Sequence, residues 1–197
     1  MKKTILSFVI ISLSTLGASA QVNFGLKAAM NISTLRGDDV EDVKSLIGAN
    51  IGAFVNIPVS TMFSVQPEVL YSMEGAKEDG TDSKLMLNYV NIPLMLKYTD
   101  PSGFFGEFGP QIGFLTSAKA KEDGDTEDIK DFFKSTNFSV GIGAGFNFTP
   151  SVGVGLRYNL GLSNISEDSE ADIKTGNFSI GIHYSFGGGG GGAASKK

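Results

Sequence analysis

The sequence predicts an all-β protein: an eight-stranded, closed, antiparallel up-and-down transmembrane β-barrel. Apolar residues alternate with small or polar ones in eight segments, each of roughly 11 residues, the length that a tilted strand needs to cross a bilayer. The face opposite the apolar one is mostly Gly, Asn and Ser, which suits a narrow lumen better than a water-exposed surface. Short turns and long polar loops alternate strictly between the segments, as in outer-membrane barrels.

Each predicted strand has the period of two residues that places large apolar side chains on one face. In the first segment, Phe24, Leu26 and Met30 alternate with Gly25 and Lys27. No apolar run after the first twenty residues reaches the length of about 18 residues that indicates a spanning helix. The predicted strands are 22–32, 47–57, 62–73, 85–98, 104–116, 138–148, 152–162 and 177–186.

The polar faces of these strands carry few charges. A charge in a narrow lumen must pair, because an isolated buried charge costs several kcal/mol. We therefore expect a paired network that plugs the lumen and stiffens the barrel, with transport or gating as the alternative role. Arg157 should engage Glu68, Glu107 or both, in space left by Gly155 and Gly161. The predicted network consists of Lys27, Glu68, Lys97, Glu107 and Arg157.

The connections differ in length and charge. Three are tight turns rich in Pro, Ser and Gly, at 58–61, 100–103 and 149–151. Four are long: 33–46, 74–84, 118–135 and 164–175. The long loops hold 18 of the 21 acidic and nine of the 16 basic residues, a net charge of −9. This pattern predicts an acidic outer end, with both termini in the periplasm.

Prolines fall inside three predicted strands, at Pro67, Pro93 and Pro110. A closed barrel has no free edge on which to place a residue without a backbone N–H. We therefore expect local β-bulges at these three positions.

The two ends of the chain lie outside the predicted barrel. Residues 1–20 are typical of a signal peptide, with Lys2 and Lys3 before an apolar stretch and Ala18-Ser19-Ala20 as the cleavage pattern. The barrel domain is then 21–186. Residues 187–197 form a flexible glycine-rich tail, which is either native or an artificial addition at the end of the chain.

Composition argues against several classes of function. The chain has no cysteine and one histidine, so we expect neither thiolate chemistry nor a histidine-based metal site. A net charge of −5 argues against nucleic acid as a partner. His183 should point into the lumen with no acid or serine partner in sight, so we expect neither catalysis nor a cofactor. The acidic stretch 122–128 is interpreted as a solvated loop, with weak divalent-cation binding as the alternative.

The strand motifs are similar to those of one known family. Gln66-Pro67-Glu68-Val69-Leu70-Tyr71-Ser72, Asn88-Tyr89-Val90-Asn91-Ile92-Pro93-Leu94 and Gly109-Pro110-Gln111-Ile112-Gly113 resemble the core motifs of the PorT-like outer-membrane β-barrel family of Bacteroidota. Gly25-Leu26-Lys27-Ala28 and Asn31-Ile32-Ser33 are similar as well. The resemblance covers the mature domain and implies an eight-stranded barrel of the cell envelope. One namesake of the family assists type IX protein secretion.

The last strand resembles the assembly signal of outer-membrane proteins, carried here by Ser179, Gly181, Tyr184 and Phe186. The implied partners are outer-membrane lipid, lipopolysaccharide and the barrel-assembly machinery. Three functions remain open at this point: a structural or surface-interaction barrel acting through its acidic outer loops, a narrow porin-like pore for small solutes or ions, and an accessory subunit of a secretion or assembly machine. The first of these is favoured, with protein partners at the outer loops.

Overall fold

The computed structural model describes residues 22–37, 43–78, 80–81, 83–122, 124–168 and 171–186. The segments assigned to the signal peptide and to the glycine-rich tail lie outside these described residues. Strands dominate, because nearly every segment with a period of two finds a neighbour to pair with. The strands are β1 (Asn23–Arg36), β2 (Val43–Pro58), β3 (Phe63–Glu78), β4 (Lys84–Thr99), β5 (Phe104–Glu122), β6 (Asp125–Asp128), β7 (Thr136–Asn147), β8 (Val152–Gly161) and β9 (Lys174–Ser185).

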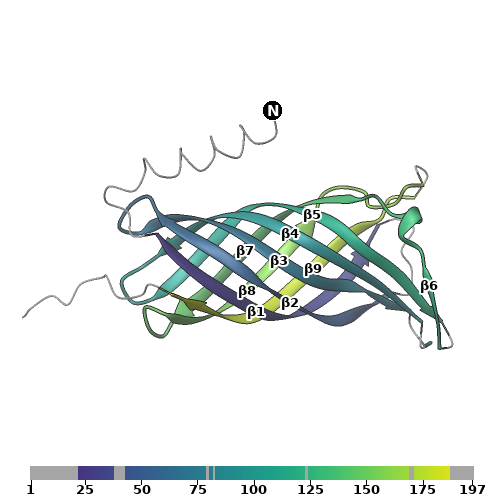
Figure 1. Ribbon diagram of the computed structural model, residues 1–197, viewed down its shortest axis with the longest axis horizontal. Coiled ribbons are helices and arrows are strands. Elements are labelled where there is room, and N and C mark those ends of the chain that lie inside the picture. Colours follow the sequence, from purple (N-terminus) through teal and green to yellow (C-terminus); the bar gives the residue numbers. More distant parts are fainter. Residues whose placement is uncertain are drawn as a thin grey trace, which may run out of the picture.

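Eight of these strands close into a ring. The order is β4-β3-β2-β1-β9-β8-β7-β5, every neighbouring pair is antiparallel, and the pairing of β4 with β5 completes the circle. β6 stands outside the ring and forms a hairpin on the end of β5. Figure 1 shows the tilted strands wound around one axis, with β6 protruding at one end. The predicted closed, eight-stranded antiparallel barrel is confirmed.

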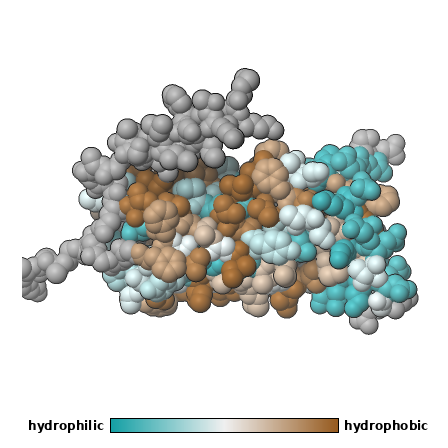
Figure 2. Space-filling view, in the orientation of Figure 1, coloured by the Kyte–Doolittle hydropathy of each residue, from teal (hydrophilic) through white to brown (hydrophobic). Residues whose placement is uncertain are grey.

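The alternation of side chains separates the wall from the lumen. Large apolar side chains point outward; Ile51, Ile142 and Ile182 are each more than 60% exposed. Their neighbours along each strand point inward and are small or polar. Figure 2 shows the resulting apolar surface on one side of the wall and a hydrophilic region at the end of the barrel that carries β6. Among the described residues, no helix has the length and apolar character needed to span a membrane.

At the end opposite β6, three tight turns join the strands. In the β4–β5 turn, the amide of Gly103 donates to the carbonyl of Asp100 (3.0 Å), and Gly103 adopts a φ of +99° that disfavours other residues. In the β7–β8 turn, the Thr149 hydroxyl accepts a hydrogen bond from the amide of Val152. These turns lie where the sequence places them.

The long loops are shorter than the sequence suggests. β3 continues to Glu78, β4 begins at Lys84 and β5 continues to Glu122, so much of the predicted loops 74–84 and 118–135 is paired strand. Within the acidic stretch 122–128, Glu122 of β5 pairs with Asp125 of β6, and β6 continues to Asp128, so the prediction of a loop there is wrong. Charged residues resemble a loop in sequence, but on a strand that continues beyond the apolar wall the outward face meets water and tolerates charge.

The predicted bulges at the three prolines are also wrong. The β3–β4 register continues from Pro67↔Leu94 to Leu70↔Asn91 without a shift, and the β5–β7 register passes Pro110↔Val140 unchanged. The register shifts lie elsewhere, between Ser45 and Asn50 and between Asn88 and Tyr89. A proline removes one ladder donor, but it needs no additional residue in the strand, so the register can pass it unchanged.

Candidate functional site

The lumen brings together side chains that are far apart in the sequence. Lys27 lies on β1, Glu68 on β3, Glu107 on β5 and Arg157 on β8, and each occupies an inward position of its strand. In the ring, β3 and β8 lie on opposite walls, as do β1 and β5. The contacts of Arg157 with Glu68 and of Lys27 with Glu107 therefore cross the full width of the lumen.

Arg157 is the centre of this network. Its Nη1 and Nη2 donate to Oε2 and Oε1 of Glu68 at 2.8 and 2.7 Å, and its Nε donates to Oε1 of Glu107 at 2.7 Å. Arg157 is 3% exposed and Glu68 is 1% exposed, so these contacts are largely shielded from water. The planar guanidinium can serve two carboxylates at once because its donors form a rigid fork.

Lys27 and Gln66 complete the shell around the carboxylates. The Lys27 ammonium lies 3.5 Å from Oε1 of Glu68 and 3.8 Å from Oε1 of Glu107. The Gln66 amide donates to Oε1 of Glu68 at 2.8 Å. Each carboxylate is therefore in contact with two cations, which offsets the cost of removing it from water.

Lys97 is placed differently from the other four predicted charges. It pairs in register with Glu107, yet its ammonium lies over the ring of Phe105, 3.8 Å from the ring centroid. No carboxylate of the described residues lies within 4.0 Å of this ammonium. Lys97 is 7% exposed and reaches the edge of the network without joining it by an ion pair.

A glycine on the neighbouring strand β7 makes room for the network. A Cβ at Gly143 would lie 2.9 Å from Oε1 of Glu107 and 2.6 Å from the carbonyl oxygen of Leu156, closer than real Cβ atoms come. Gly161, which the sequence suggested as the space for Arg157, instead lies against Thr175. The glycine-rich face of β7 therefore accommodates the carboxylate of Glu107. The expectation for Gly161 was wrong because the sequence does not reveal the stagger of the strands.

A second barrier closes the lumen on the side of β6. Tyr89 and Leu87 of β4, Leu115 and Ala118 of β5, and Ile165 of the β8–β9 loop form a buried apolar cluster. Tyr89, Leu87, Ala118 and Ile165 are fully buried. The sequence predicts a lumen lined mostly by Gly, Asn and Ser with a few charges, and large apolar side chains were not expected there. The continuing alternation inward from Met95 would have revealed Tyr89 and Leu87 as large inward-facing side chains.

Glu74 is a further buried carboxyl group of the lumen, at a position that the sequence analysis assigned to a loop. It continues the inward series of β3 two positions beyond Ser72 and is 5% exposed. Its Oε1 accepts a hydrogen bond from Nδ2 of Asn91 at 3.0 Å. Next to it, Nδ2 of Asn31 donates to the hydroxyl of Ser72 at 2.9 Å. These hydrogen-bonded polar side chains lie beside the apolar cluster, because Ser72 and Glu74 are the register partners of Tyr89 and Leu87.

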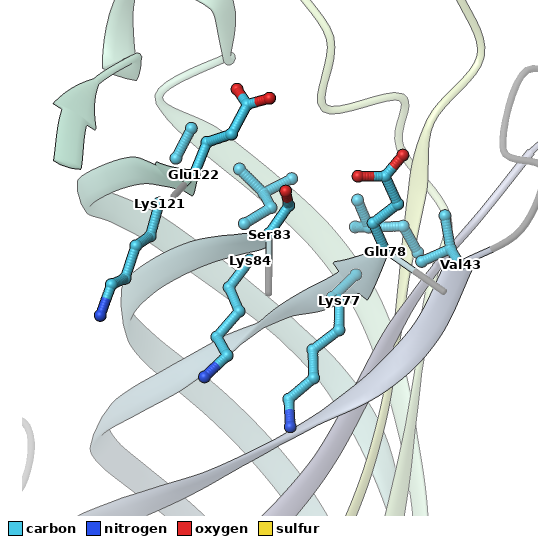
Figure 3. Close-up of a pocket in the computed structure, with 11 residues that line it drawn as sticks. Val43, Lys77, Glu78, Ser83, Lys84, Lys121 and Glu122 are labelled. Atoms are coloured by element: carbon cyan, nitrogen blue, oxygen red, sulfur yellow. The ribbon is translucent and has the colours of Figure 1, made fainter. Parts of the chain in front are cut away.

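Two cavities open at opposite ends of the barrel. One, of about 390 Å³, lies at the end with the tight turns and is lined by Asn56, Lys97 and His183 among others. The other, of about 250 Å³, lies at the opposite mouth, between the ends of β3, β4 and β5 (Figure 3). The space beside Arg157 and Glu107 has a volume of about 10 Å³, which is at most the volume that one water molecule needs. The side chains of the network therefore fill most of the space in this section of the lumen.

His183 lines the cavity at the end with the tight turns and contacts two aromatic rings. Its ring is 5.6 Å from that of Phe105 and 6.1 Å from that of Phe54, both in edge-on geometry. A hydrogen bond of 2.9 Å joins its Nε2 to Oδ1 of Asn147. Among the described residues, no group of three or more His, Cys, Asp or Glu side chains is arranged to hold a metal ion. What these contacts supply is packing and orientation of the imidazole.

The residues of the assembly signal divide between the two faces of β9. Ser179 lies inward and is 5% exposed, and Gly181 lies against the backbone of Ala28 on β1. Tyr184 and Phe186 point outward, with ring centroids 5.2 Å apart. Their outward orientation leaves both aromatic rings accessible on the wall of the barrel.

Comparisons with known proteins give the same architecture. Neisserial surface protein A (NspA) is 16% identical in sequence; the match covers 83% of this chain and 97% of NspA, with a TM-score of 0.59. Ail, the attachment invasion locus protein of Yersinia pestis, is 18% identical, with 84% and 99% of the two chains covered and a TM-score of 0.52. No curated protein matches the chain. The model of the outer membrane protein beta-barrel domain matches residues 17–167. Together with the closed ring of eight strands, this match shows that the chain belongs to the outer membrane protein beta-barrel domain family.

Proposed function

We propose that this outer-membrane barrel acts through the surface at its β6 end, as a structural or surface-interaction protein, and neither conducts solutes nor catalyses a reaction. The observation that carries the proposal is the double closure of the lumen. The network of Arg157, Glu68, Glu107 and Lys27 crosses it, and the apolar cluster around Tyr89 blocks it again. A solute would have to break buried ion pairs and displace packed side chains to pass.

The distribution of charge supports a role at one end. The four predicted long loops hold 18 acidic and nine basic residues. Glu74 is buried in the lumen, which leaves 17 acidic residues and a net charge of −8 for this end. Ail, a barrel of similar fold, has been crystallised with the polyanion sucrose octasulfate. The acidic end of this barrel favours a partner of the opposite charge, such as a basic protein surface.

We further propose that the β6 end faces outward and that both termini face the periplasm. The support is the contrast between tight turns at one end and charged, extended hairpins at the other, the usual arrangement of outer-membrane barrels. The chain has no cysteine, so single cysteines can report the orientation. In intact cells, a membrane-impermeant maleimide should label Thr126→Cys on β6 and spare Ser102→Cys in the β4–β5 turn. The reverse labelling pattern would contradict the orientation.

Planar-bilayer recording tests the closed lumen. We expect the purified, refolded barrel to show no stable single-channel conductance. A stable conductance of nanosiemens would replace this proposal with a pore. The same sample should be run on SDS gels before and after boiling, as a control for folding. Boiling changes the mobility of a closed barrel and leaves that of an unfolded sample unchanged.

Binding of a basic probe tests the surface role. The barrel in nanodiscs of zwitterionic lipid should bind fluorescent polylysine, and the binding should weaken with salt. The variant Asp125→Asn/Glu127→Gln/Asp128→Asn, which removes three exposed charges of β6, should bind less. Equal binding by the two proteins would remove β6 from the proposed surface.

A second candidate function is that of an accessory subunit in a secretion or assembly machine. The observation that favours it is the resemblance of the β3, β4 and β5 motifs to the PorT-like family of Bacteroidota. These motifs include Gln66–Ser72 and Gly109–Gly113. Co-purification of the barrel with a larger envelope complex, together with an altered profile of secreted proteins in a deletion strain, would favour this function over that of an independent surface protein.

A further inference from the structure

Four lysines stand side by side on four neighbouring strands. In the strand registers, Lys44 of β2 is the partner of Lys77 of β3, Lys77 is the partner of Lys84 of β4, and Lys84 is the partner of Lys121 of β5. Neighbouring strands are about 4.8 Å apart, so the four positions extend over about 15 Å. We call these four residues the lysine row.

The lysine row faces the outside of the barrel. Ala76 and Leu85, which adjoin Lys77 and Lys84 in sequence, lie on the lumen side, and Ala76 is 3% exposed. Because side chains alternate along a strand, the lysines point the other way. Figure 3 shows the side chains of Lys77, Lys84 and Lys121 extending in one direction, while those of Glu78 and Glu122 extend in another.

The lysine row lies just beyond the apolar wall. On β3, the outward-facing Met73 is 49% exposed and precedes Lys77 by four residues. With the usual rise and tilt of barrel strands, four residues correspond to about 10 Å along the barrel axis. A lysine side chain can extend back toward the membrane, so its ammonium reaches the level of the lipid headgroups.

Three members of the lysine row, Lys77, Lys84 and Lys121, form no ion pair among the described residues. Like charges on directly paired positions of neighbouring strands repel each other. A basic row of this kind is stabilised when an anion outside the protein lies along it.

We propose that the lysine row binds the phosphate groups of lipid A, the membrane anchor of lipopolysaccharide, in the outer leaflet. This proposal rests on the proposed orientation, which places the row in that leaflet. Lipid A carries two phosphates on one disaccharide, whereas a phospholipid such as phosphatidylglycerol carries one. A row of four ammonium groups can contact both phosphates through charge-assisted hydrogen bonds, which gives it a preference for lipid A.

Native mass spectrometry of the barrel in a neutral detergent, titrated with bisphosphorylated lipid A, tests the proposal. The wild-type barrel should retain lipid A. The variant Lys77→Gln/Lys84→Gln should bind it about tenfold more weakly, because each surface lysine adds measurably to the attraction for an anionic lipid. The control variant Lys134→Gln/Lys174→Gln removes the same charge beyond the other side of the ring and should bind as the wild type does. Equal weakening in the two variants would overturn the proposal.

Two further ligands define what the row recognises. Lipid A without phosphates should be retained poorly, and phosphatidylglycerol should bind more weakly than lipid A. Equal retention of phosphatidylglycerol would mean general attraction to anionic headgroups and would overturn the specific site. Both variants should keep the gel shift of the folded barrel. Binding in detergent does not depend on membrane orientation, so a failed titration counts against the row, and a reversed cysteine-labelling pattern counts against the orientation.

Discussion

Arg157 on β8 and Glu68 on β3 are joined across the lumen by two parallel hydrogen bonds of 2.8 and 2.7 Å. The two strands lie four positions apart in a ring of eight, so this pair connects opposite walls. Lys27 and Glu107 connect the other two walls at 3.8 Å. These two contacts cross in the lumen, and the hydrogen bond between Arg157 and Glu107 links them. Together they brace the barrel in two directions.

Removing the arginine should destabilise the barrel strongly. Arg157→Met leaves the buried carboxylate of Glu68 with Lys27 as its remaining cation, at an expected cost of about 3–5 kcal/mol. The measurement is the temperature at which the SDS-resistant form disappears. The double variant Arg157→Met/Glu68→Gln should recover much of the loss, because Lys27 still neighbours Glu107. An unchanged temperature in Arg157→Met would show that the pair contributes nothing to stability.

A single methyl group at Gly143 should disturb the network. In Gly143→Ala the new Cβ would lie 2.9 Å from Oε1 of Glu107, so the carboxylate must move away from Arg157. We expect a loss of about 1–3 kcal/mol, seen as a lower melting temperature of the SDS-resistant form. Gly106→Ala is the matched control, because its Cβ would meet nothing closer than the Gly143 oxygen at 4.0 Å. Equal effects in the two variants would contradict the packing described here.

The β8–β9 loop should depend on one buried side chain. Ile165 is fully buried against Tyr89 and Leu115, so Ile165→Ala should cost about 2–5 kcal/mol of local stability. We expect faster proteolysis of the loop in the refolded barrel. Leu162→Ala provides the control, since Leu162 is 57% exposed and its truncation leaves no internal cavity. Proteolysis that is as slow in Ile165→Ala as in the wild type would show that the loop is anchored elsewhere.

The carboxyl group of Asp100, in the β4–β5 turn, should titrate at a lower pH than that of an ordinary aspartate. Hydrogen bonds from the hydroxyl and then the backbone amide of Ser102 to Asp100 lower the pKa of its carboxyl group. The ionised carboxylate therefore stabilises the turn above its unfolded pKa, and this stabilisation is lost as the pH falls through the lowered value. In Ser102→Ala the pKa of Asp100, followed by the ¹³C shift of its carboxyl carbon, should rise. Ser151→Ala in the β7–β8 turn should leave it unchanged.

The alternation of residues was sufficient to predict the wall of the barrel but not its length. Segment 62–73 has a clear apolar face, whereas its continuation to Glu78 pairs with β4 without that face. A two-residue period detects a strand only where the two sides face different environments. Beyond the apolar wall the outward face of the hairpin also becomes polar, as at Lys77 and Lys84, so the pattern disappears although the backbone ladder continues.

The composition of the lumen was predictable, whereas its contacts were predictable only in part: Arg157 engages both Glu68 and Glu107 as expected, but Lys97 does not form an ion pair with them. The inward position of Arg157 follows from its place between outward-facing Leu156 and Tyr158. Its partners depend on the stagger of the eight strands, because the stagger determines which side chains of β3 and β5 lie at the same height in the lumen as Arg157. Similarly, Lys97 pairs in register with Glu107, but its ammonium lies over Phe105 because Arg157 and Lys27 already surround the carboxylate. Such competition between partners leaves no trace in a single sequence.

The pairing of β1 with β9 runs from Gly25↔Ser185 to Arg36↔Lys174 and joins the first strand of the barrel to the last. Until β9 is in place, β1 and β8 each present an unpaired backbone edge, and no internal element can cover either one. A chain interrupted before Lys174 would therefore carry two open edges into the membrane, where water cannot satisfy them. Folding should accordingly be all-or-none, with its slowest contact between residues separated by most of the domain. The chain must be kept from aggregating until its final strand has been synthesised.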